Sequence, residues 1–252
     1  MSTRIRIGGF QIGPLEEEEM LEKLGEQNYD DLDIVVFPER FIVDTFHEFP
    51  QSRASKMLSG ISKGRILVAG SVLEKTDKGI FNRSYVFMNG KIIGFQDKIV
   101  PFDRERGWVE KGRIINIFRT PVITFSVPIC YDIDFPFYAK ISALKGATLL
   151  INPSLIRKDF HQEWHLYIQS RALENRISVI SVNSNNANFE GDSIFVDTYE
   201  ENNGVRVLKL EALNMDKFTC EYSDGNVDKK REQRKIEDPG YYSFPSKEII
   251  YE

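Results

Sequence analysis

Short apolar runs alternate with amphipathic stretches along the whole chain. Residues 33–38 (DIVVFP) and 147–152 (ATLLIN) are almost continuously apolar, which is typical of strands buried on both faces. Other stretches carry apolar residues at helical spacing, and one of them stops at Gly146, a residue that suits a helix end. The pattern predicts helices over residues 15–27, 51–62, 136–144 and 160–176.

The predicted strands are short and separated by turn signals. Asn89-Gly90 divides two of them and indicates a hairpin, because both residues tolerate a positive φ. About a dozen strands with only four or five helices do not suit a simple doubly wound sheet, so we expect two sheets packed face to face with helices outside. The expected strands cover residues 4–11, 33–38, 66–73, 84–88, 91–96, 115–118, 122–127, 147–152, 177–182, 193–196, 205–210 and 218–222.

Composition limits the class of protein. The chain has 252 residues, which suits one hydrophobic core, so we expect a single domain over residues 1–252. No apolar run approaches the roughly 20 residues that span a bilayer, and the N-terminal stretch has no apolar signal-peptide core. The net charge of −5 leaves no basic footprint for nucleic acid. Two cysteines cannot form a disulfide framework and fit a reducing compartment, so we expect a cytoplasmic protein without nucleic-acid or membrane partners.

The C-terminal tail, residues 224–252, has a mixed character. It is highly charged as far as Pro239 and then carries Tyr241, Tyr242 and Phe244. A charged tail is usually solvated, whereas an aromatic end more often packs against something. Another subunit is one candidate for that contact.

Three polar residues stand where apolar strands end: Glu39, Lys98 and Cys130. Chemistry in α/β proteins concentrates at the carboxyl ends of strands, where loops open to solvent on a rigid sheet. A thiol at a strand-to-helix turn lies near a helix N-terminus, whose positive potential favours the thiolate. Taken singly, each residue has an ordinary structural explanation, because a lone cysteine is more often a small buried hydrophobe and a strand-end charge is usually solvated.

Other kinds of site have little support. His161 and His165 have the spacing of a zinc-protease motif, but the glutamate between them, Glu163, stands at the wrong position, so two ordinary histidines are favoured. The chain has no GxGxxG segment after a strand, no GxxxxGK[ST] loop and no GxSxG elbow. A nucleotide cofactor therefore has no support in the sequence.

The three strand-end residues lie in segments that resemble the carbon–nitrogen hydrolase family, also called the nitrilase superfamily, in its amidase-like branch. The matching segments follow one another in the family's order over about residues 5–196. They are VVFPERF around Glu39, DKIVPFDRERGWVEKG from residue 97, PICYDIDFPFYAKISALKGATLLINPS around Cys130, WHLYIQSRALENRISVISVN from residue 164, and GDS at residues 191–193.

The resemblance implies an αββα sandwich of two mixed sheets, usually assembled as a homodimer or larger homo-oligomer. It also implies an active site with no metal and no organic cofactor, in which Cys130 is the nucleophile, Glu39 the base, and Lys98 with the backbone N–H of Tyr131 the donors to the oxyanion. Glu105 matches the family's second active-site glutamate, and Glu110 is a less suitable alternative because it stands too close to the closing Gly112.

The residues after the nucleophile bear on the reaction subclass. Many nitrilases of this family have Trp-Glu there, whereas this chain has Tyr131-Asp132, as many amidases and carbamoyl-amide hydrolases do. We therefore expect hydrolysis of a small linear amide through a thioester on Cys130. A nitrilase, an acyltransferase, a non-catalytic scaffold and a redox-sensing thiol remain the alternatives.

Overall fold

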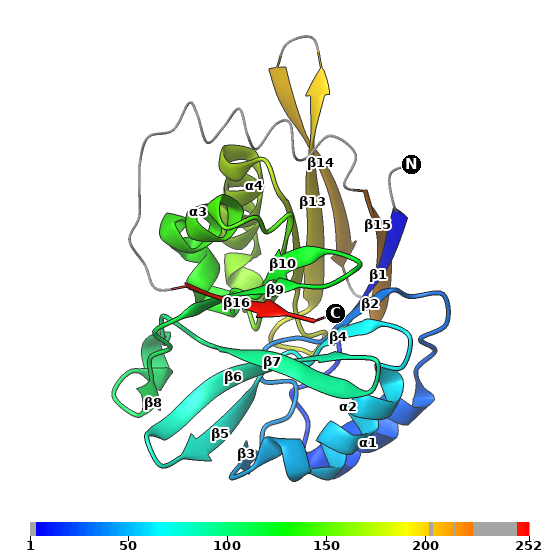
Figure 1. Ribbon diagram of the computed structural model, residues 1–252, viewed down its shortest axis with the longest axis vertical. Helices are drawn as coiled ribbons and strands as arrows, with labels where there is room; N and C mark the ends of the chain where they lie inside the picture. The colour runs from blue at the N-terminus through cyan, green and yellow to red at the C-terminus, as the bar shows by residue number, and fades with distance from the viewer. Residues whose placement is uncertain (1–3, 202–203, 214, 224–245, 252) are drawn as a thin grey trace.

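The computed structural model describes residues 4–201, 204–213, 215–223 and 246–251. Its described strands form two mixed sheets that face each other (Figure 1). The first sheet has nine strands, seven of them in the order β15-β1-β2-β4-β6-β5-β3, with β7 and β8 also paired to β6. These strands are β1 (Arg4–Phe10), β2 (Ile34–Val36), β3 (Thr45–Phe46), β4 (Ile66–Val68), β5 (Val72–Thr76), β6 (Gly79–Met88), β7 (Lys91–Asp97), β8 (Val109–Glu110) and β15 (Lys217–Ser223).

The second sheet has seven strands in the order β14-β13-β12-β11-β10-β9-β16. Strands β10, β11 and β12 run parallel at its centre, and β11 corresponds to the continuous apolar run at residues 147–152. The strands are β9 (Ile115–Arg119), β10 (Thr124–Ser126), β11 (Leu149–Pro153), β12 (Ser178–Val182), β13 (Gly191–Glu201), β14 (Gly204–Leu213) and β16 (Ser246–Ile250).

Helices cover the outer face of each sheet, so the expected αββα sandwich is confirmed (Figure 1). Helices α1 (Glu17–Glu26) and α2 (Arg53–Ile61) pack on the first sheet, and α3 (Pro136–Leu144) and α4 (His161–Asn175) on the second. Successive residues of a strand point to opposite faces. Along β11, Leu149 and Ile151 enter the core between the sheets, while Leu150 packs against the helices. This double burial explains why the strand is continuously apolar.

The expected strand over residues 66–73 is wrong as one element. It is divided into β4 and β5 by a break at residues 69–71. Gly70 in the break has φ +48°, and a Cβ built on it would lie 1.9 Å from the carbonyl oxygen of Pro38. This close backbone approach requires glycine, and hydropathy alone does not reveal it.

The short strands β3, β8 and β16 were not expected either. Strand β16 pairs in parallel with β9 of the same chain. The rest of the tail, residues 224–245, lies outside the described residues, so the expected contact of the tail with a partner subunit stays a prediction.

Candidate active site

The candidate residues come together where the two sheets meet at their strand ends. Glu39 follows β2, Lys98 follows β7 of the same sheet, and Cys130 follows β10 of the other sheet. The backbone N–H of Glu39 donates to the carbonyl oxygen of Ser154, which follows β11, over 3.2 Å. This hydrogen bond joins the two sheets directly at the site.

Lys98 lies at the centre of the cluster and is 1% exposed. Its Nζ is 2.7 Å from Glu39 Oε1 and 2.6 Å from Glu105 Oε2. Glu105 is brought there by a short 3₁₀ helix, η2 (Asp103–Glu105), and its Oε2 also accepts from the backbone N–H of Phe102. The alternative residue Glu110 lies elsewhere, on β8 against Gly79.

Cys130 begins the 3₁₀ helix η3 (Cys130–Asp134) in a left-handed conformation with φ 46°. A non-glycine residue adopts this conformation at a cost of about 1–2 kcal/mol, so its surroundings must hold it. Asn152 Nδ2 donates to the carbonyl oxygens of Pro128 and Cys130 at 2.8 and 3.3 Å. The buried thiol lies close enough to the Glu39 carboxylate for that carboxylate to raise the pKa of Cys130. The chain thus turns sharply at Cys130, and the turn is held from Asn152.

Tyr131 follows Cys130 directly, so its backbone N–H lies at the start of η3 beside the nucleophile candidate. The Tyr131 ring packs edge-on against Phe102, with ring centroids 4.9 Å apart. This aromatic contact connects the segment that carries Glu105 to the segment that carries Cys130.

The charges of the cluster support one another. Burial alone would lower the pKa of Lys98, but the charges of Glu39 and Glu105, and that of the Cys130 sulfur once it is ionised, outweigh burial and raise that pKa. Burial opposes the charge of Glu105 as well, yet the ammonium of Lys98 lowers the pKa of Glu105 overall. Lys98 therefore stays protonated, and Glu105 stays ionised, at neutral pH.

The thiol behaves differently from the sequence-based expectation. Burial and the charge of Glu39 raise the pKa of Cys130 well above its usual value, and Lys98 and the backbone N–H of Leu155 offset only part of this. The expectation that a helix N-terminus favours the thiolate is therefore wrong for this site. The sulfur holds its proton at rest, and it needs a base to become nucleophilic.

Three buried polar residues of the site were not among the site residues expected from the sequence. Asn82 on β6 donates from Nδ2 to Glu39 Oε1 at 2.8 Å and to Glu105 Oε1 at 2.7 Å. Its position carried no signal, because the expected strand began at residue 84. Asn152, which supports the Cys130 turn, ends an apolar run and was taken as part of a buried strand. The third residue is Asp132.

Asp132 connects the segment that carries Lys98 to the segment that carries Cys130. Its carboxylate is fully buried and accepts from the backbone N–H groups of Ile99, Val100 and Ile129, with the shortest distances at 3.1, 2.8 and 3.0 Å. Ile99 follows Lys98, and Ile129 precedes Cys130. Burial raises the pKa of Asp132 to about 7, while these amides and Lys98 favour its ionised form.

The two helix histidines make contacts with acidic groups. His161 Nδ1 lies 3.2 Å, and His165 Nε2 3.5 Å, from Asp192 Oδ2. In the described ranges, no group of three or more His, Cys, Asp or Glu residues is arranged to hold a metal ion. Among the same residues, every helix is too short or too polar to cross a membrane.

Comparison with known proteins identifies relatives of the chain. The model of the carbon-nitrogen hydrolase family matches residues 16–206. A probable nitrilase of Schizosaccharomyces pombe is 36% identical over 111 residues, and an omega-amidase of Saccharomyces cerevisiae is 33% identical over 179 residues. These alignments cover 44% and 60% of this chain, but only 41% and 60% of the two relatives, which is less than two thirds of either.

A solved structure matches nearly the whole chain. It is the crystal structure of a Saccharomyces cerevisiae protein from branch 10 of the nitrilase superfamily. The two share 25% sequence identity and superpose with a TM-score of 0.77 over 95% of this chain and 97% of that one.

Proposed function

Because the chain belongs to the carbon–nitrogen hydrolase family, we propose that it is an enzyme that hydrolyses small linear amides through a thioester on Cys130. The observation that carries this proposal is the position of Lys98 Nζ, held 2.7 Å from Glu39 and 2.6 Å from Glu105 beside a buried thiol. A scaffold protein has no use for such a cluster, because it buries two carboxylates and an ammonium.

The reaction begins with proton transfer. Glu39 accepts the proton of Cys130 Sγ as the sulfur attacks the carbonyl carbon of the amide, so a C–S bond forms and the carbonyl oxygen becomes an oxyanion. Burial and the charge of Glu39 raise the pKa of the thiol, so the proton transfer to Glu39 is the step that makes the sulfur nucleophilic.

The oxyanion needs donors that are already in place. A lysine ammonium has three N–H groups. The contacts to Glu39 and Glu105 use two of them, which leaves one for the oxyanion. The backbone N–H of Tyr131 supplies a second donor, and a donor of this kind typically contributes about 3–4 kcal/mol.

Collapse of the oxyanion breaks the C–N bond. Glu39 returns its proton to the departing nitrogen, ammonia leaves, and the acyl group stays on Cys130 as a thioester. Glu39 then accepts a proton from water as the water oxygen attacks the thioester carbon. The C–S bond breaks, Glu39 returns the proton to the sulfur of Cys130, and the carboxylic acid is released. Glu105 keeps Lys98 charged and in place during both halves of the reaction.

The proposed substrate is an amide and not a nitrile, since Tyr131-Asp132 follows the nucleophile and one relative is an omega-amidase. The test is ammonia release from a panel of short aliphatic amides, amides with a distal carboxylate, carbamoyl amides and the matching nitriles. Turnover of amides supports the proposal. Turnover of nitriles alone makes the protein a nitrilase, and acyl transfer to an added amine without hydrolysis makes it an acyltransferase.

We also propose that the enzyme is a cytoplasmic homodimer or larger homo-oligomer. Leu166 and Leu173, two turns apart on α4, are 57% and 37% exposed, and a second copy would cover them. Both cysteines are free, which suits a reducing compartment. Light scattering after size exclusion tests the assembly, and a monomer at micromolar concentration contradicts it.

A further inference from the structure

The side-chain amide of Asn82 lies between the two glutamates of the site. Asn82 is completely buried on β6. Its Nδ2 donates to Glu39 Oε1 over 2.8 Å and to Glu105 Oε1 over 2.7 Å. An amide nitrogen carries two hydrogens, so both are used, one for each carboxylate.

The two glutamates differ in how many of their carboxylate oxygens accept hydrogen bonds. Glu39 receives both Asn82 and Lys98 on the same oxygen, Oε1. Glu105 receives Asn82 on Oε1, and Lys98 and the Phe102 amide on Oε2. The contacts of Asn82 and Lys98 thus leave Oε2 of Glu39 for proton exchange, whereas both oxygens of Glu105 are engaged.

We propose that Asn82 is a positioning residue for the reaction: its single amide group holds Glu39 as a base that acts through one oxygen and holds Glu105 as an anchored counter-charge to Lys98. The inference rests on the proposed function. It assigns different roles to two glutamates that both accept a hydrogen bond from Lys98. The difference between them arises from Asn82, a neutral donor that neither composition nor motif revealed.

The neutrality of the donor matters. Two carboxylates and one ammonium leave the buried cluster with one excess negative charge before the thiol reacts. A carboxylate in place of the amide would add another negative charge within hydrogen-bond distance of both glutamates, and like charges in a poorly solvated site repel strongly. An amide supplies two donors with no change in charge.

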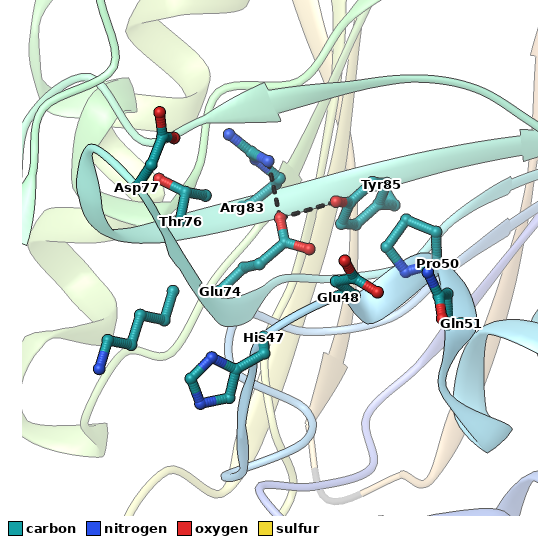
Figure 2. Close-up of a pocket in the computed structure, with 10 residues that line it drawn as sticks. His47, Glu48, Pro50, Gln51, Glu74, Thr76, Asp77, Arg83 and Tyr85 are labelled. Carbon is teal, nitrogen blue, oxygen red and sulfur yellow. Dashed lines mark hydrogen bonds and ion pairs between the residues drawn. The ribbon is translucent and has the colours of Figure 1, made fainter.

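Ion pairs on the opposite face of the sheet hold the strand segment that carries Asn82. Arg83, the next residue, points the other way and pairs with Asp97 Oδ1 at 2.6 Å and Glu74 Oε2 at 2.6 Å. Figure 2 shows the Glu74 carboxylate facing Arg83 and Tyr85. These three side chains line a pocket of about 710 Å³. Asp97 precedes Lys98, whose backbone N–H donates to the carbonyl oxygen of Asn82 over 2.8 Å. The ion pairs therefore fix the register of the two strand segments that carry Asn82 and Lys98.

The side-chain oxygen of Asn82 indicates that this residue is present for function and not for stability. Asn82 Oδ1 is buried and has no hydrogen-bond partner among the residues that the structure describes. A buried acceptor without a partner costs about 1–3 kcal/mol of stability. Local violations of this kind are typical of functional positions, and here the donors of the same amide are both used.

The test is the near-isosteric substitution Asn82→Asp, with Asn116→Asp as a matched control. Asn116 is also a buried strand asparagine whose Nδ2 donates to a carbonyl oxygen, that of Phe95, but it lies outside the site. We expect kcat/KM for the cleaved amide to fall on the order of 100-fold at pH 8 in Asn82→Asp. The loss should shrink as the pH is lowered toward 5, because the introduced carboxyl becomes neutral and regains a donor. Asn116→Asp should follow the wild-type pH profile.

A profile of Asn82→Asp that runs parallel to the wild type would overturn the inference. If that variant does not unfold cooperatively, Asn82→Ala replaces it, and an unchanged kcat in Asn82→Ala overturns the inference equally. Failure of the proposed function is distinguishable, because the wild type would then release no ammonia from any amide. In that case the rate of Cys130 alkylation by iodoacetamide still reports the base: Asn82→Asp should change its pH dependence, and an unchanged dependence contradicts the role of Asn82.

Discussion

The contact between Gly70 and Pro38 offers a way to move the base without touching it. Gly70 is buried in the break between β4 and β5, and Pro38 immediately precedes Glu39. In Gly70→Ala, the new Cβ would lie 1.9 Å from the carbonyl oxygen and 2.9 Å from the carbonyl carbon of Pro38. Both are backbone atoms, so no side chain can rotate away to relieve the clash.

The size of the effect follows from these distances. Cβ contacts below 3.0 Å are essentially never seen, so the Pro38 carbonyl and the Gly70 backbone must separate by about 1 Å. A displacement of that size in a catalytic group costs on the order of 100-fold in rate, which corresponds to about 2.7 kcal/mol. We therefore expect kcat/KM to fall about 100-fold in Gly70→Ala.

Two other glycines, one in α2 and one in the turn that follows it, provide control substitutions. Gly64 has φ +75° with nothing within 4 Å of a built Cβ, so Gly64→Ala measures the backbone strain alone, about 1 kcal/mol of unfolding free energy. Gly60 lies within α2 and is equally open, so Gly60→Ala should stabilise the helix by about 0.5–1 kcal/mol. Both should keep wild-type kcat/KM.

The assay combines ammonia release with urea unfolding of the wild type and the three variants. The reasoning requires Gly70→Ala to lose activity while it still unfolds cooperatively. If Gly70→Ala folds and retains kcat/KM within twofold of Gly64→Ala, the Pro38–Gly70 contact does not set the position of Glu39.

Three further outcomes are expected. Burial raises the pKa of Asp132 to about 7, above the roughly 3.9 of an unfolded aspartate, so the folded state binds the proton more tightly. The unfolding free energy should therefore fall by about 3 kcal/mol as the pH rises from 4 to 7. Asp132→Asn should remove that slope in urea titrations, and an unchanged slope contradicts this. Lys98→Met leaves two buried carboxylates without their cation, so it should abolish ammonia release and lower stability by about 3–5 kcal/mol; wild-type turnover would refute the role of Lys98. Asn152→Ala removes the donor that holds the turn at Cys130 and should slow alkylation of the thiol about tenfold or more, whereas an unchanged rate would show that the turn holds itself.

The layer architecture could be predicted from the apolar pattern, because a strand buried on both faces appears in the sequence as a continuous run of apolar residues. The pattern also gave α3 correctly at residues 136–144, where Pro136 and Gly146 bracket the helix. The hairpin at Asn89-Gly90 is confirmed by positive φ at both residues. These features depend on local chemistry or on a simple period, which a single sequence displays.

The rest depends on contacts between distant segments. The break at Gly70 comes from the approach of Pro38, and Asn82 receives its meaning only from Glu39 and Glu105. The raised pKa of the thiol was not foreseen for the same reason, because burial and a facing carboxylate arise only when the two sheets meet. Strand-end position and family resemblance could bring the main site residues to attention, but they could not show how the oxygens of two glutamates are shared.

The central claim is that Cys130 carries the acyl group. It is tested most directly by mixing the enzyme with a cleaved amide, quenching in acid within the first turnovers and measuring the intact mass. The account predicts a mass increase that corresponds to one acyl group and that maps to the peptide with Cys130. The adduct should persist in Cys220→Ser, since Cys220 is buried in the core between the sheets, and it should disappear together with turnover in Cys130→Ala. Full turnover by Cys130→Ala, or an acyl group on Cys220, would contradict the account.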